Sequence, residues 1–501
     1  MLASVQSFSV VGLDAARVTV EVDLAQGLPA LTLVGLPDKA VEESKERVRS
    51  AIANTGARFP LRRITVNLAP ADVRKIGPAY DLPIALGIPI ADEQVRLAIG
   101  VSLAFVGELA LNGELRPVRG GVLAMAMHAR ALGFKEFFVP PENAPEAALV
   151  DGLIVRPTAS LRALLRHLAG EESLPEQPPT VCSATTTQSD VDFAHVRGQA
   201  QAKRALEIAA AGGHNVLLTG PPGAGKTLLA KAFASILPPL LADEALEVTR
   251  IHSVAGTLTR SGIVGGPPIR SPHHTTSAVA LIGGGAWPRT GEISLAHRGV
   301  LFLDELPEFP RTVLEVLRQP LEDGIVTVSR AAHSVTFPAK FILLAAQNPC
   351  PCGYAGSSRC TCSPSQVERY ARRVSGPLTD RIDLHVSVAA VQYEELTAST
   401  DAESSNTIRE RVATARARQA ERFGGTRATN AEMTAAEIPR YCQPTQTATD
   451  LLERAMRHYQ LSARGYHRVL KLARTIADLA GSDQIDAPHV AESVQYRVQT
   501  T

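Results

Sequence analysis

Residues 220–227 read GPPGAGKT, and this stretch decides the fold. It matches the pattern G-x-x-x-x-G-K-[ST] at every specified position. We predict an apolar strand at 215–219 before it and an Ala/Leu-rich helix at 228–237 after it. Backbone N–H groups of such a loop, with the N-terminus of the following helix, favour the negative charge of a polyphosphate. A glycine-rich turn that merely joins strand to helix is the alternative, but motif, strand and helix agree here.

Two side chains of this loop carry the predicted chemistry. Lys226 is expected to reach the β- and γ-phosphates of a nucleoside triphosphate, and the Thr227 hydroxyl to bind Mg²⁺. The complete predicted binding loop consists of Gly220, Pro221, Pro222, Gly223, Ala224, Gly225, Lys226, Thr227 and Leu228.

A second nucleotide motif follows at residues 299–305, GVLFLDE, which reads as a buried strand ending in two acids. Asp304 would hold the magnesium through water, and Glu305 would polarise the attacking water. A purely structural pair of acids is the alternative. Thr227 and Asp304 are 77 positions apart (304 minus 227), more than a simple strand–helix–strand crossover needs, so we expect an insertion.

The insertion contains two loops rich in turn residues, at 265–274 and 282–290. Their candidate contact residues are Arg270, His273, His274, Trp287 and Arg289. Such residues on glycine-rich loops suit contacts to a nucleic acid in a central channel, and they suit plain loops that cap the domain equally well.

Residues 324–339 alternate in two halves and predict a hairpin with a basic tip around 330–333. The next apolar strand, 341–346, ends at Gln347 and Asn348. An amide at Asn348 would read the γ-phosphate and position water. Strands ending side by side with polar groups at one edge fit the ligand-binding rule for open parallel sheets.

Four of the six cysteines are packed into 13 residues as C-x-C, seven residues, C-x-C. They are Cys350, Cys352, Cys360 and Cys362. Four thiols are enough for a tetrahedral zinc site, although each arm is shorter than the usual C-x2-4-C. A zinc site and a reduced, metal-free loop are therefore the two alternatives for this segment.

Two arginines are candidates for catalysis from outside the binding loop. Arg381, in SGPLTDRIDLH, is either an arginine finger acting on a neighbouring subunit's nucleotide or a partner in a structural salt bridge. Arg468 lies in an amphipathic helix of a C-terminal helical region, which would form a lid over the nucleotide. The arginine-rich stretch 407–422 reads as a largely solvated helix.

Composition sets the frame for these motifs. The chain has 501 residues, of which 45% are hydrophobic and 20% charged, with a net charge of +1. This is a globular composition for two or three domains, without a global basic field. No long apolar run or signal-like N-terminus is visible, so we expect a cytoplasmic protein without a membrane partner. The predicted division is 1–168 as an α/β domain, 169–192 as a linker, 193–390 as the nucleotide-binding core and 391–501 as the helical lid.

Several strings together resemble the Mg-chelatase-like AAA+ ATPases, most closely the bacterial ComM/YifB competence-protein family. They are GPPGAGKT, IRSPHH, GEISLAHRGVLFLDELPEF, AAQNPCPCG, SGPLTDRIDLH and SARGYHRVLKLARTIADL. The resemblance implies a central AAA+ module of the helix-2-insert clade, with a parallel sheet. Lys226 and Thr227 match Walker A, and Asp304 and Glu305 match Walker B. Asn348 matches sensor 1, Arg381 the arginine finger and Arg468 sensor 2.

The N-terminal region resembles the α/β proteolytic domain of Lon proteases, through KIGPAYDLPIALGI and GELALNGELRPVRGG. Those enzymes use a Ser-Lys dyad. Ala79 stands where the serine would be, and no lysine occurs between residues 101 and 134. A serine nucleophile cannot act without its hydroxyl and its base, so we expect a binding or ring-stabilising module and no peptidase.

The resemblance implies an ATP- and Mg²⁺-dependent motor that moves DNA, with branch migration in homologous recombination and natural transformation as its expected role. A site that is complete only when Arg381 of the next subunit enters it requires a closed, head-to-tail ring, most plausibly a hexamer. Two alternatives stay open: a magnesium-chelatase-type motor and a protein-remodelling ATPase that acts on a protein partner.

Overall fold

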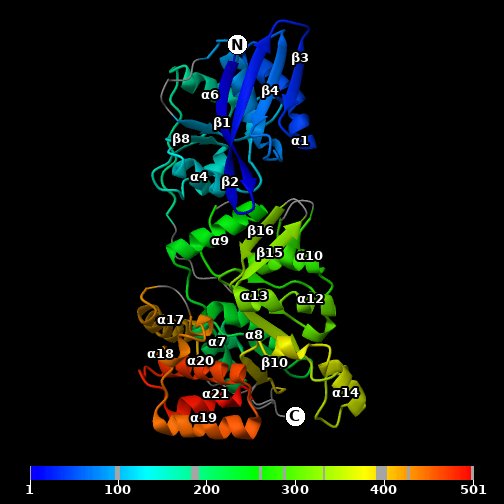
Figure 1. The fold of residues 1–501 in the computed structure, drawn as a ribbon, viewed down its shortest axis with the longest axis vertical. Coiled ribbons are helices and arrows are strands. Elements are labelled where there is room, and N and C mark those ends of the chain that lie inside the picture. Colours follow the sequence, from blue (N-terminus) through cyan, green and yellow to red (C-terminus); the bar gives the residue numbers. More distant parts are fainter. Residues whose placement is uncertain are drawn as a thin grey trace. The chain divides into compact units, whose positions relative to one another are not determined.

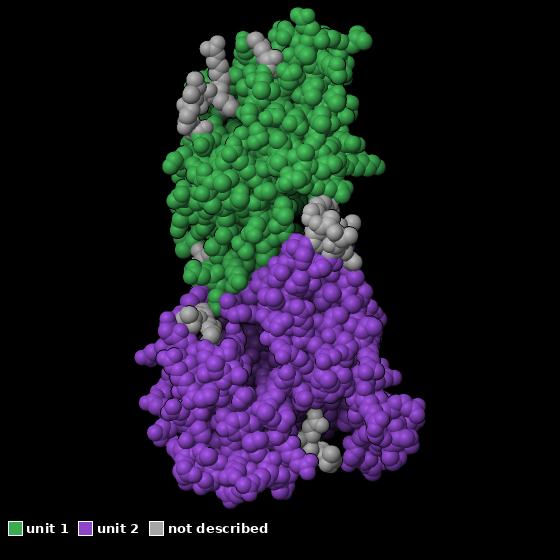
Figure 2. All heavy atoms as spheres, viewed as in Figure 1, with its two compact units in different colours: residues 1–183, 242–264 green, residues 184–241, 265–501 purple. Residues whose placement is uncertain are grey.

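The computed structural model describes residues 2–95, 102–181, 191–258, 262–285, 289–330, 333–390, 403–425 and 429–497. It divides into two compact units (Figures 1 and 2). Unit 1 comprises residues 1–183 and 242–264, and unit 2 comprises residues 184–241 and 265–501. Within the described residues, no helix is both long and apolar enough to cross a membrane. Trp287, Cys182 and the tip of the predicted basic hairpin at 331–332 lie outside the described residues.

Unit 1 is built on a mixed seven-stranded sheet with the order β3-β4-β2-β1-β5-β8-β9. The strands are β1 (Leu2–Val11), β2 (Asp14–Ala25), β3 (Ala30–Val34), β4 (Arg63–Ala69), β5 (Leu103–Phe105), β8 (Glu136–Val139) and β9 (Ile154–Pro157). Val18, Val20 and Val22 of β2 are fully buried while the residues between them are more exposed, as the two-residue period of a strand requires. A short hairpin, β6 (Glu108–Leu109) and β7 (Leu115–Arg116), lies outside this sheet.

Helical elements accompany these strands in unit 1 (Figure 1). They are α1 (Lys39–Glu42), α2 (Ser44–Thr55), η1 (Pro78–Tyr80), α3 (Asp81–Ala91), α4 (Val122–Ala131), η2 (Pro141–Asn143), α5 (Ala144–Ala147), α6 (Leu161–Leu168) and α9 (Ala242–Ala255). Helix α2 ends at Thr55, because Gly56 takes the left-handed conformation (φ 89°) that glycine accepts readily. The N-terminal region is therefore an α/β unit.

Helix α9 belongs to unit 1, although it follows the P-loop helix in the sequence. The N–H of Gly121 donates to the carbonyl (3.0 Å) and the hydroxyl (3.1 Å) of Ser253 in α9. The Ser253 hydroxyl donates to the Glu146 carboxylate, which also accepts the Leu123 N–H (2.8 Å) at the start of α4. Burial raises the pKa of Glu146. The range 193–390, which the sequence analysis assigns to the nucleotide-binding core, includes α9. In the structure, however, α9 packs on α4 and belongs to unit 1.

Unit 2 contains a five-stranded, fully parallel sheet with the order β11-β14-β17-β10-β18. The strands are β10 (Val216–Thr219), β11 (Ile269–Arg270), β14 (Val300–Leu303), β17 (Ile342–Gln347) and β18 (Leu384–Ser387). The three central strands are almost entirely buried apolar runs, as expected for strands covered on both faces. Because the strands are parallel, all of their carboxyl ends meet at one edge.

The other elements of unit 2 surround this sheet. Before the lid they are η3 (Phe193–His195), α7 (Ala200–Gly212), α8 (Lys226–Phe233), η4 (Ala234–Ile236), α10 (Ala278–Ile282), β12 (Gly283–Gly284), β13 (Arg289–Thr290), α11 (Glu292–Leu295), η5 (Leu306–Glu308), α12 (Arg311–Glu315), α13 (Arg318–Asp323), β15 (Ile325–Arg330), β16 (His333–Pro338), α14 (Pro364–Ala371) and α15 (Gly376–Thr379). Strands β15 and β16 pair antiparallel, so the predicted hairpin at 324–339 is present.

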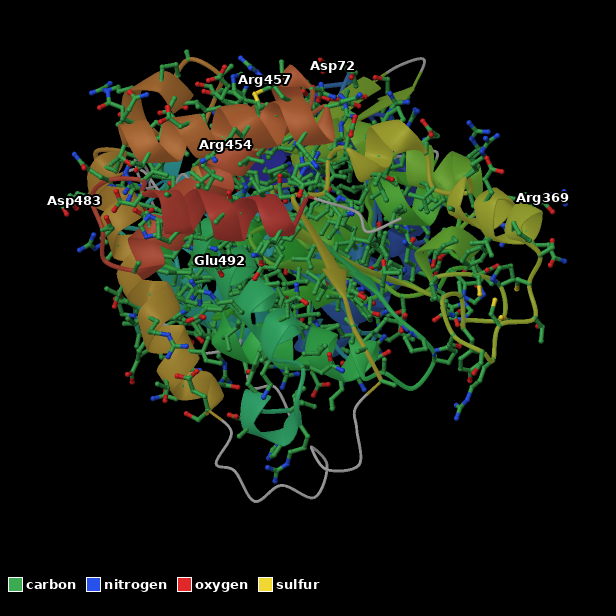
Figure 3. All side chains as sticks on the ribbon, turned by 90° about the horizontal axis from the view of Figure 1, so that it is seen from below. Asp72, Arg369, Arg454, Arg457, Asp483 and Glu492 are labelled. Carbon is green, nitrogen blue, oxygen red and sulfur yellow. The ribbon has the colours of Figure 1, made fainter. Side chains whose placement is uncertain are left out.

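The C-terminal lid is helical, as predicted. Its elements are α17 (Ser405–Arg422), η6 (Asn430–Glu432), α18 (Ile438–Tyr441), α19 (Gln446–Tyr459), α20 (Ala463–Leu479) and α21 (Ala487–Gln495). Figure 3 labels several of its charged residues, among them Glu492 of α21, whose carboxylate accepts from Arg204 of α7 (2.9 Å).

Helix α17 is not the largely solvated helix that its arginines suggest. Arg411 donates to Glu207 (2.6 Å) and Arg416 to the carbonyl of Ala210 (2.7 Å), both in α7, and Arg422 pairs with the fully buried Asp478 of α20. The arginines therefore fasten the lid to the first helix of the nucleotide-binding core.

The buried pair Arg47–Asp81 in unit 1 yields a stability prediction. Asp81 has no exposed side-chain surface and accepts from Arg47 Nε (2.6 Å), Arg47 Nη2 (3.0 Å) and the Leu109 N–H (3.2 Å). Burial raises the pKa of Asp81 to about 6, although hydrogen bonds from Arg47 and Leu109 lower it. Arg47→Leu leaves this carboxylate without a cation and should destabilise unit 1 by about 3 kcal/mol at pH 8.

Native-state amide hydrogen exchange of β2 and β4 in the full chain measures this loss. Because the folded-state pKa is raised, protonation below pH 6 removes the buried charge, so the loss should shrink toward pH 5. Arg116→Leu, which breaks an exposed pair with Glu108 (3.8 Å), is the control and should cost less than about 1 kcal/mol. Equal losses for the two variants would contradict the prediction.

Candidate nucleotide site

The predicted P-loop connects β10 to α8, and its glycines have distinct tasks. Gly223 (φ 77°) and Gly225 (φ 86°) are in the left-handed region and shape the turn. Gly220 is needed for space, because a Cβ there would lie 2.2 Å from the carbonyl oxygen of Val388. The loop thus packs against the chain leaving β18, and any side chain at Gly220 would push it outward.

Lys226 points back over the loop. Its Nζ donates to the carbonyls of Gly220 (2.7 Å) and Pro221 (2.9 Å) and to Oδ1 of Asn348 (3.0 Å). Burial lowers the pKa of this ammonium, while Asp304 and Glu305 raise it. The structure therefore brings the predicted Walker A lysine and the predicted sensor 1 amide into direct contact.

The predicted magnesium ligands also meet. The Thr227 hydroxyl donates to Asp304 Oδ2 (2.8 Å), and Asp304 Oδ1 accepts the N–H of Glu305 (2.9 Å). Hydroxyl and carboxylate oxygens are the donors that Mg²⁺ prefers, so this pair fits the metal that accompanies a nucleoside triphosphate. Glu305 stands in the left-handed region (φ 53°) and its carboxylate is about half exposed, which suits a base that must reach water.

The 265–274 loop supplies a neighbour that the sequence did not indicate. Nδ1 of His274 lies 3.5 Å from a carboxylate oxygen of Glu305, and the His274 ring packs on His273 with centroids 4.0 Å apart. Arg270 forms a two-point ion pair with Glu292 (2.6 and 2.9 Å). The sequence left two interpretations of this loop open, contact with a nucleic acid and capping of the domain. The ion pair with Glu292 makes Arg270 a capping residue, whereas His274 faces Glu305, the candidate base.

The two candidate catalytic arginines lie away from this P-loop. Arg381 donates to the carbonyl of Pro377 (2.8 Å) and pairs with Glu322 of α13, which also accepts from Arg464 (3.3 Å). Arg468 donates to Asp383 (2.8 Å). Asp383 and Arg381 both bond to Asn215, the residue just before β10.

This places both arginines at the amino end of the sheet. The P-loop begins at the other end of β10, whose four residues span roughly 13 Å. Burial raises the pKa of Asp383, but Arg468 and His214 outweigh it and hold that pKa well below its ordinary value. Asp383 is thus a charged anchor for Arg468, and neither Asp383 nor Glu322 carried a recognisable sequence signal.

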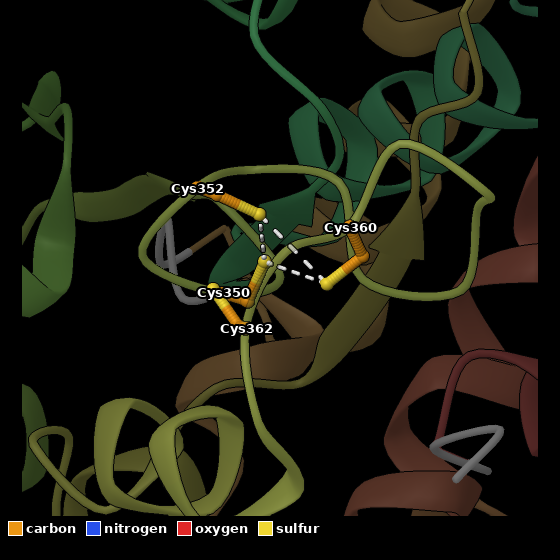
Figure 4. A group of neighbouring side chains, drawn as sticks. All are labelled: Cys350, Cys352, Cys360 and Cys362. Carbon is orange, nitrogen blue, oxygen red and sulfur yellow. Dashed lines mark hydrogen bonds between the residues drawn. The ribbon is translucent and has the colours of Figure 1, made fainter.

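The four cysteines converge in the loop that follows Asn348 (Figure 4). The Sγ atom of Cys350 lies 3.3 Å from that of Cys352 and 4.0 Å from that of Cys360, and Cys352 and Cys360 are 3.8 Å apart. All four sulfur atoms, Cys362 included, lie within 4.8 Å of one another. Four thiols at these separations are a donor set that fits Zn²⁺.

In unit 1, an alanine occupies the position that the resemblance gives to the serine of a protease dyad. Ala79 is buried in η1, and the nearby buried Lys75 donates its ammonium protons to the carbonyl of Pro70. Neither side chain offers the hydroxyl that a Ser-Lys dyad requires.

Comparison with known proteins matches nearly the whole chain. Residues 192–396 match the family described as magnesium chelatase, subunit ChlI, residues 402–497 match its C-terminal region, and residues 20–143 match the family described as subunit ChlI of Mg-chelatase.

Three curated proteins show how far the similarity extends. The chain is 44% identical to the competence protein ComM of Haemophilus influenzae over 99% of the chain and 97% of that protein. It is 43% identical to YifB of Escherichia coli over the same shares. The magnesium-chelatase 67 kDa subunit of Chlorobaculum parvum is 29% identical over only 32% of the chain and 23% of that subunit. The chain therefore belongs to the Mg-chelatase-like ComM/YifB family.

Proposed function

We propose that the chain is an ATPase that works as a closed ring and moves DNA, with branch migration during recombination and natural transformation as its role in the cytoplasm. The observation that carries the ATPase part is the meeting of Lys226 with Asn348 and of Thr227 with Asp304 at one edge of the parallel sheet. The family supports the same activity, because Mg-chelatase-type AAA+ proteins are ATPases.

Each residue of this edge has a proposed task. Lys226 balances charge on the transferred phosphoryl group, Asn348 orients the γ-phosphate, and Glu305 accepts a proton from the attacking water. Mg²⁺, held through Thr227 and Asp304, supplies charge neutralisation between the phosphates when it is bound. Zn²⁺ in the four-cysteine cluster is a second proposed ion.

The ring is supported by where the arginines lie. Arg381 and Arg468 are at the amino end of the sheet, whereas their own subunit's P-loop is at the carboxyl end. Both fit a role at the nucleotide of an adjacent subunit, which a head-to-tail ring supplies. A hexamer is the size that we propose.

The proposal that DNA is the substrate rests on sequence similarity to other proteins. The relative that matches over 99% of this chain bears the name competence protein, whereas similarity to a magnesium-chelatase subunit covers 32% of it. A chelatase-type or protein-remodelling motor is the second candidate, and the match of residues 20–143 to the ChlI family favours keeping it.

Hydrolysis should fail when the phosphate-facing groups are changed. Lys226→Ala removes the cation next to the transferred group and should abolish ATP turnover. Glu305→Gln keeps the shape but not the base, and should bind ATP while hydrolysing it about 10²- to 10⁴-fold more slowly. A coupled assay of ADP release measures both. Lys231→Ala on α8 and Glu410→Gln on α17 are exposed controls of the same residue types and should keep turnover. Normal turnover by Glu305→Gln would refute the Walker B assignment.

DNA dependence decides between the two candidate substrates. ATP turnover of the purified chain should rise in the presence of single-stranded or four-way-junction DNA, and the stimulation should weaken as salt increases, since phosphate contacts release counterions. Intact basal turnover without stimulation by any DNA would support the protein-partner motor instead.

Because Arg381 is proposed to act on the nucleotide of an adjacent subunit, mixing two inactive variants should restore ATP turnover. Homogeneous Arg381→Ala and Lys226→Ala rings should both be inactive. In randomly mixed rings at equal amounts, roughly a quarter of the sites combine an intact P-loop with an intact neighbouring Arg381, so turnover should return. Mixing Lys226→Ala with Glu305→Gln is the control, because both changes damage a subunit's own site. No recovery in the first mixture, with subunit exchange verified, would place Arg381 within its own subunit's site.

A further inference from the structure

The four-cysteine loop connects three parts of the candidate nucleotide site. It begins two residues after Asn348, whose amide oxygen accepts from Lys226 (3.0 Å). In its middle, Gly353 lies against the P-loop, because a Cβ added there would be 2.5 Å from Cδ of Pro222. At its far end it enters α14, and Arg373, just beyond that helix, pairs with Glu308 (2.9 Å), three residues after Glu305.

The backbone hydrogen bonds that the structure shows within the loop are those of local turns, such as Gly353 N–H to the Cys350 carbonyl (2.9 Å) and Cys360 N–H to the Ser357 carbonyl (3.1 Å). Between the end of β17 and the start of α14 the structure has only turns, and Cys350 is its one fully buried cysteine. The Ala355 N–H donates to Cys350 Sγ (3.2 Å), the orientation that backbone groups take toward a sulfur bearing negative charge. A loop without an apolar core needs another source of order, and a metal ion is such a source.

The sulfur geometry selects the ion. Tetrahedral coordination with Zn–S bonds of about 2.3 Å separates the sulfur atoms by about 3.8 Å, and the measured separations of 3.3, 3.8 and 4.0 Å surround that value. A disulfide needs about 2.05 Å, far shorter than any of them. Thiolates favour zinc over magnesium or calcium. Among the described residues, this is the only cluster of three or more His, Cys, Asp or Glu side chains whose donor atoms converge to this extent.

We propose that Cys350, Cys352, Cys360 and Cys362 bind one Zn²⁺, and that this zinc centre holds the Asn348 loop against the P-loop, so that nucleotide affinity depends on zinc. The binding site itself is independent of the proposed DNA motor. The effect on affinity rests on the proposed ATPase.

Metal content of the full chain tests the site directly. Elemental analysis should find one zinc per chain, and the double variant Cys350→Ser with Cys352→Ser should lose it. Cys442→Ser is the matched control, since Cys442 is also buried but lies in the lid next to Met433, and it should keep the metal. Absence of zinc in the parent chain, together with four freely titrating thiols in this loop, would overturn the proposal. Because a serine variant can misfold, zinc release from the parent by a thiol-reactive mercurial, followed with a chromophoric chelator, gives the same answer without substitution.

A glycine pair separates the zinc site from its effect on the nucleotide. Gly353 (φ 87°) and Gly356 (φ 84°) have the same left-handed backbone, but a Cβ clashes with Pro222 only at Gly353, whereas Gly356 has open space. Gly353→Ala should keep its zinc and bind a fluorescent ADP analogue of the order of tenfold more weakly than Gly356→Ala does. Equal binding by the two variants would refute the bracing role. Zinc in a chain that lacks ATP turnover would leave the metal site standing and refute the proposed function.

Discussion

The parallel pairing of β10 with β17 is the constraint on which the candidate site depends. Its register sets Thr219 opposite Gln347, so the residues that follow each strand lie side by side. One ammonium, Lys226 Nζ, can therefore reach the Gly220 carbonyl (2.7 Å) and the Asn348 amide (3.0 Å) together. Strand β14 pairs with the other side of β17 and delivers Asp304 to the same edge. A one-residue shift of either register would separate these groups, of which Lys226 and Asn348 are 122 residues apart in the chain.

The same sheet separates the candidate nucleotide loop from the two candidate catalytic arginines. The two ends of the sheet carry different groups. Lys226 and the oxygen atoms of Thr227, Asp304 and Asn348 lie at the carboxyl end, whereas Arg381 and Arg468 lie at the amino end. Asp383 shows how the second end is made, because it bonds to the Asn215 N–H (3.1 Å) and to Arg468 (2.8 Å) at once. The lid helix α20 is thereby fixed to the amino ends of β10 and β18. An ATPase with this division of charges has a reason to assemble head to tail.

Local signals in the sequence were sufficient for much of this fold. The glycine-rich loop and the apolar runs ending at Asp304 and Asn348 predicted strand ends correctly, because each run is bounded by residues that cannot continue it. Contacts between distant segments were not predictable. The spacing of the cysteines does not indicate whether the loop between the two pairs folds so that all four sulfur atoms meet. The arginines of α17 likewise do not indicate that their partners in α7 are the Glu207 carboxylate and the Ala210 carbonyl. For the same reason, no pattern in 242–255 indicated that α9 would dock on α4.

Glu322 shows how one carboxylate can hold two arginines at the amino end of the sheet. It is about half exposed, and hydrogen bonding to Arg381, with the nearby charges of Arg381, Arg464 and Arg468, lowers its pKa. In the proposed ring, Arg381 would exchange Glu322 for the anionic phosphates of an adjacent nucleotide, so the main electrostatic cost of that movement would be partly offset. Arg464 stays beside Glu322, and the carboxylate is not left alone. The Arg381 side chain itself is only 10% exposed and also donates to the Pro377 carbonyl (2.8 Å), so it is held more firmly than a partner in a surface ion pair.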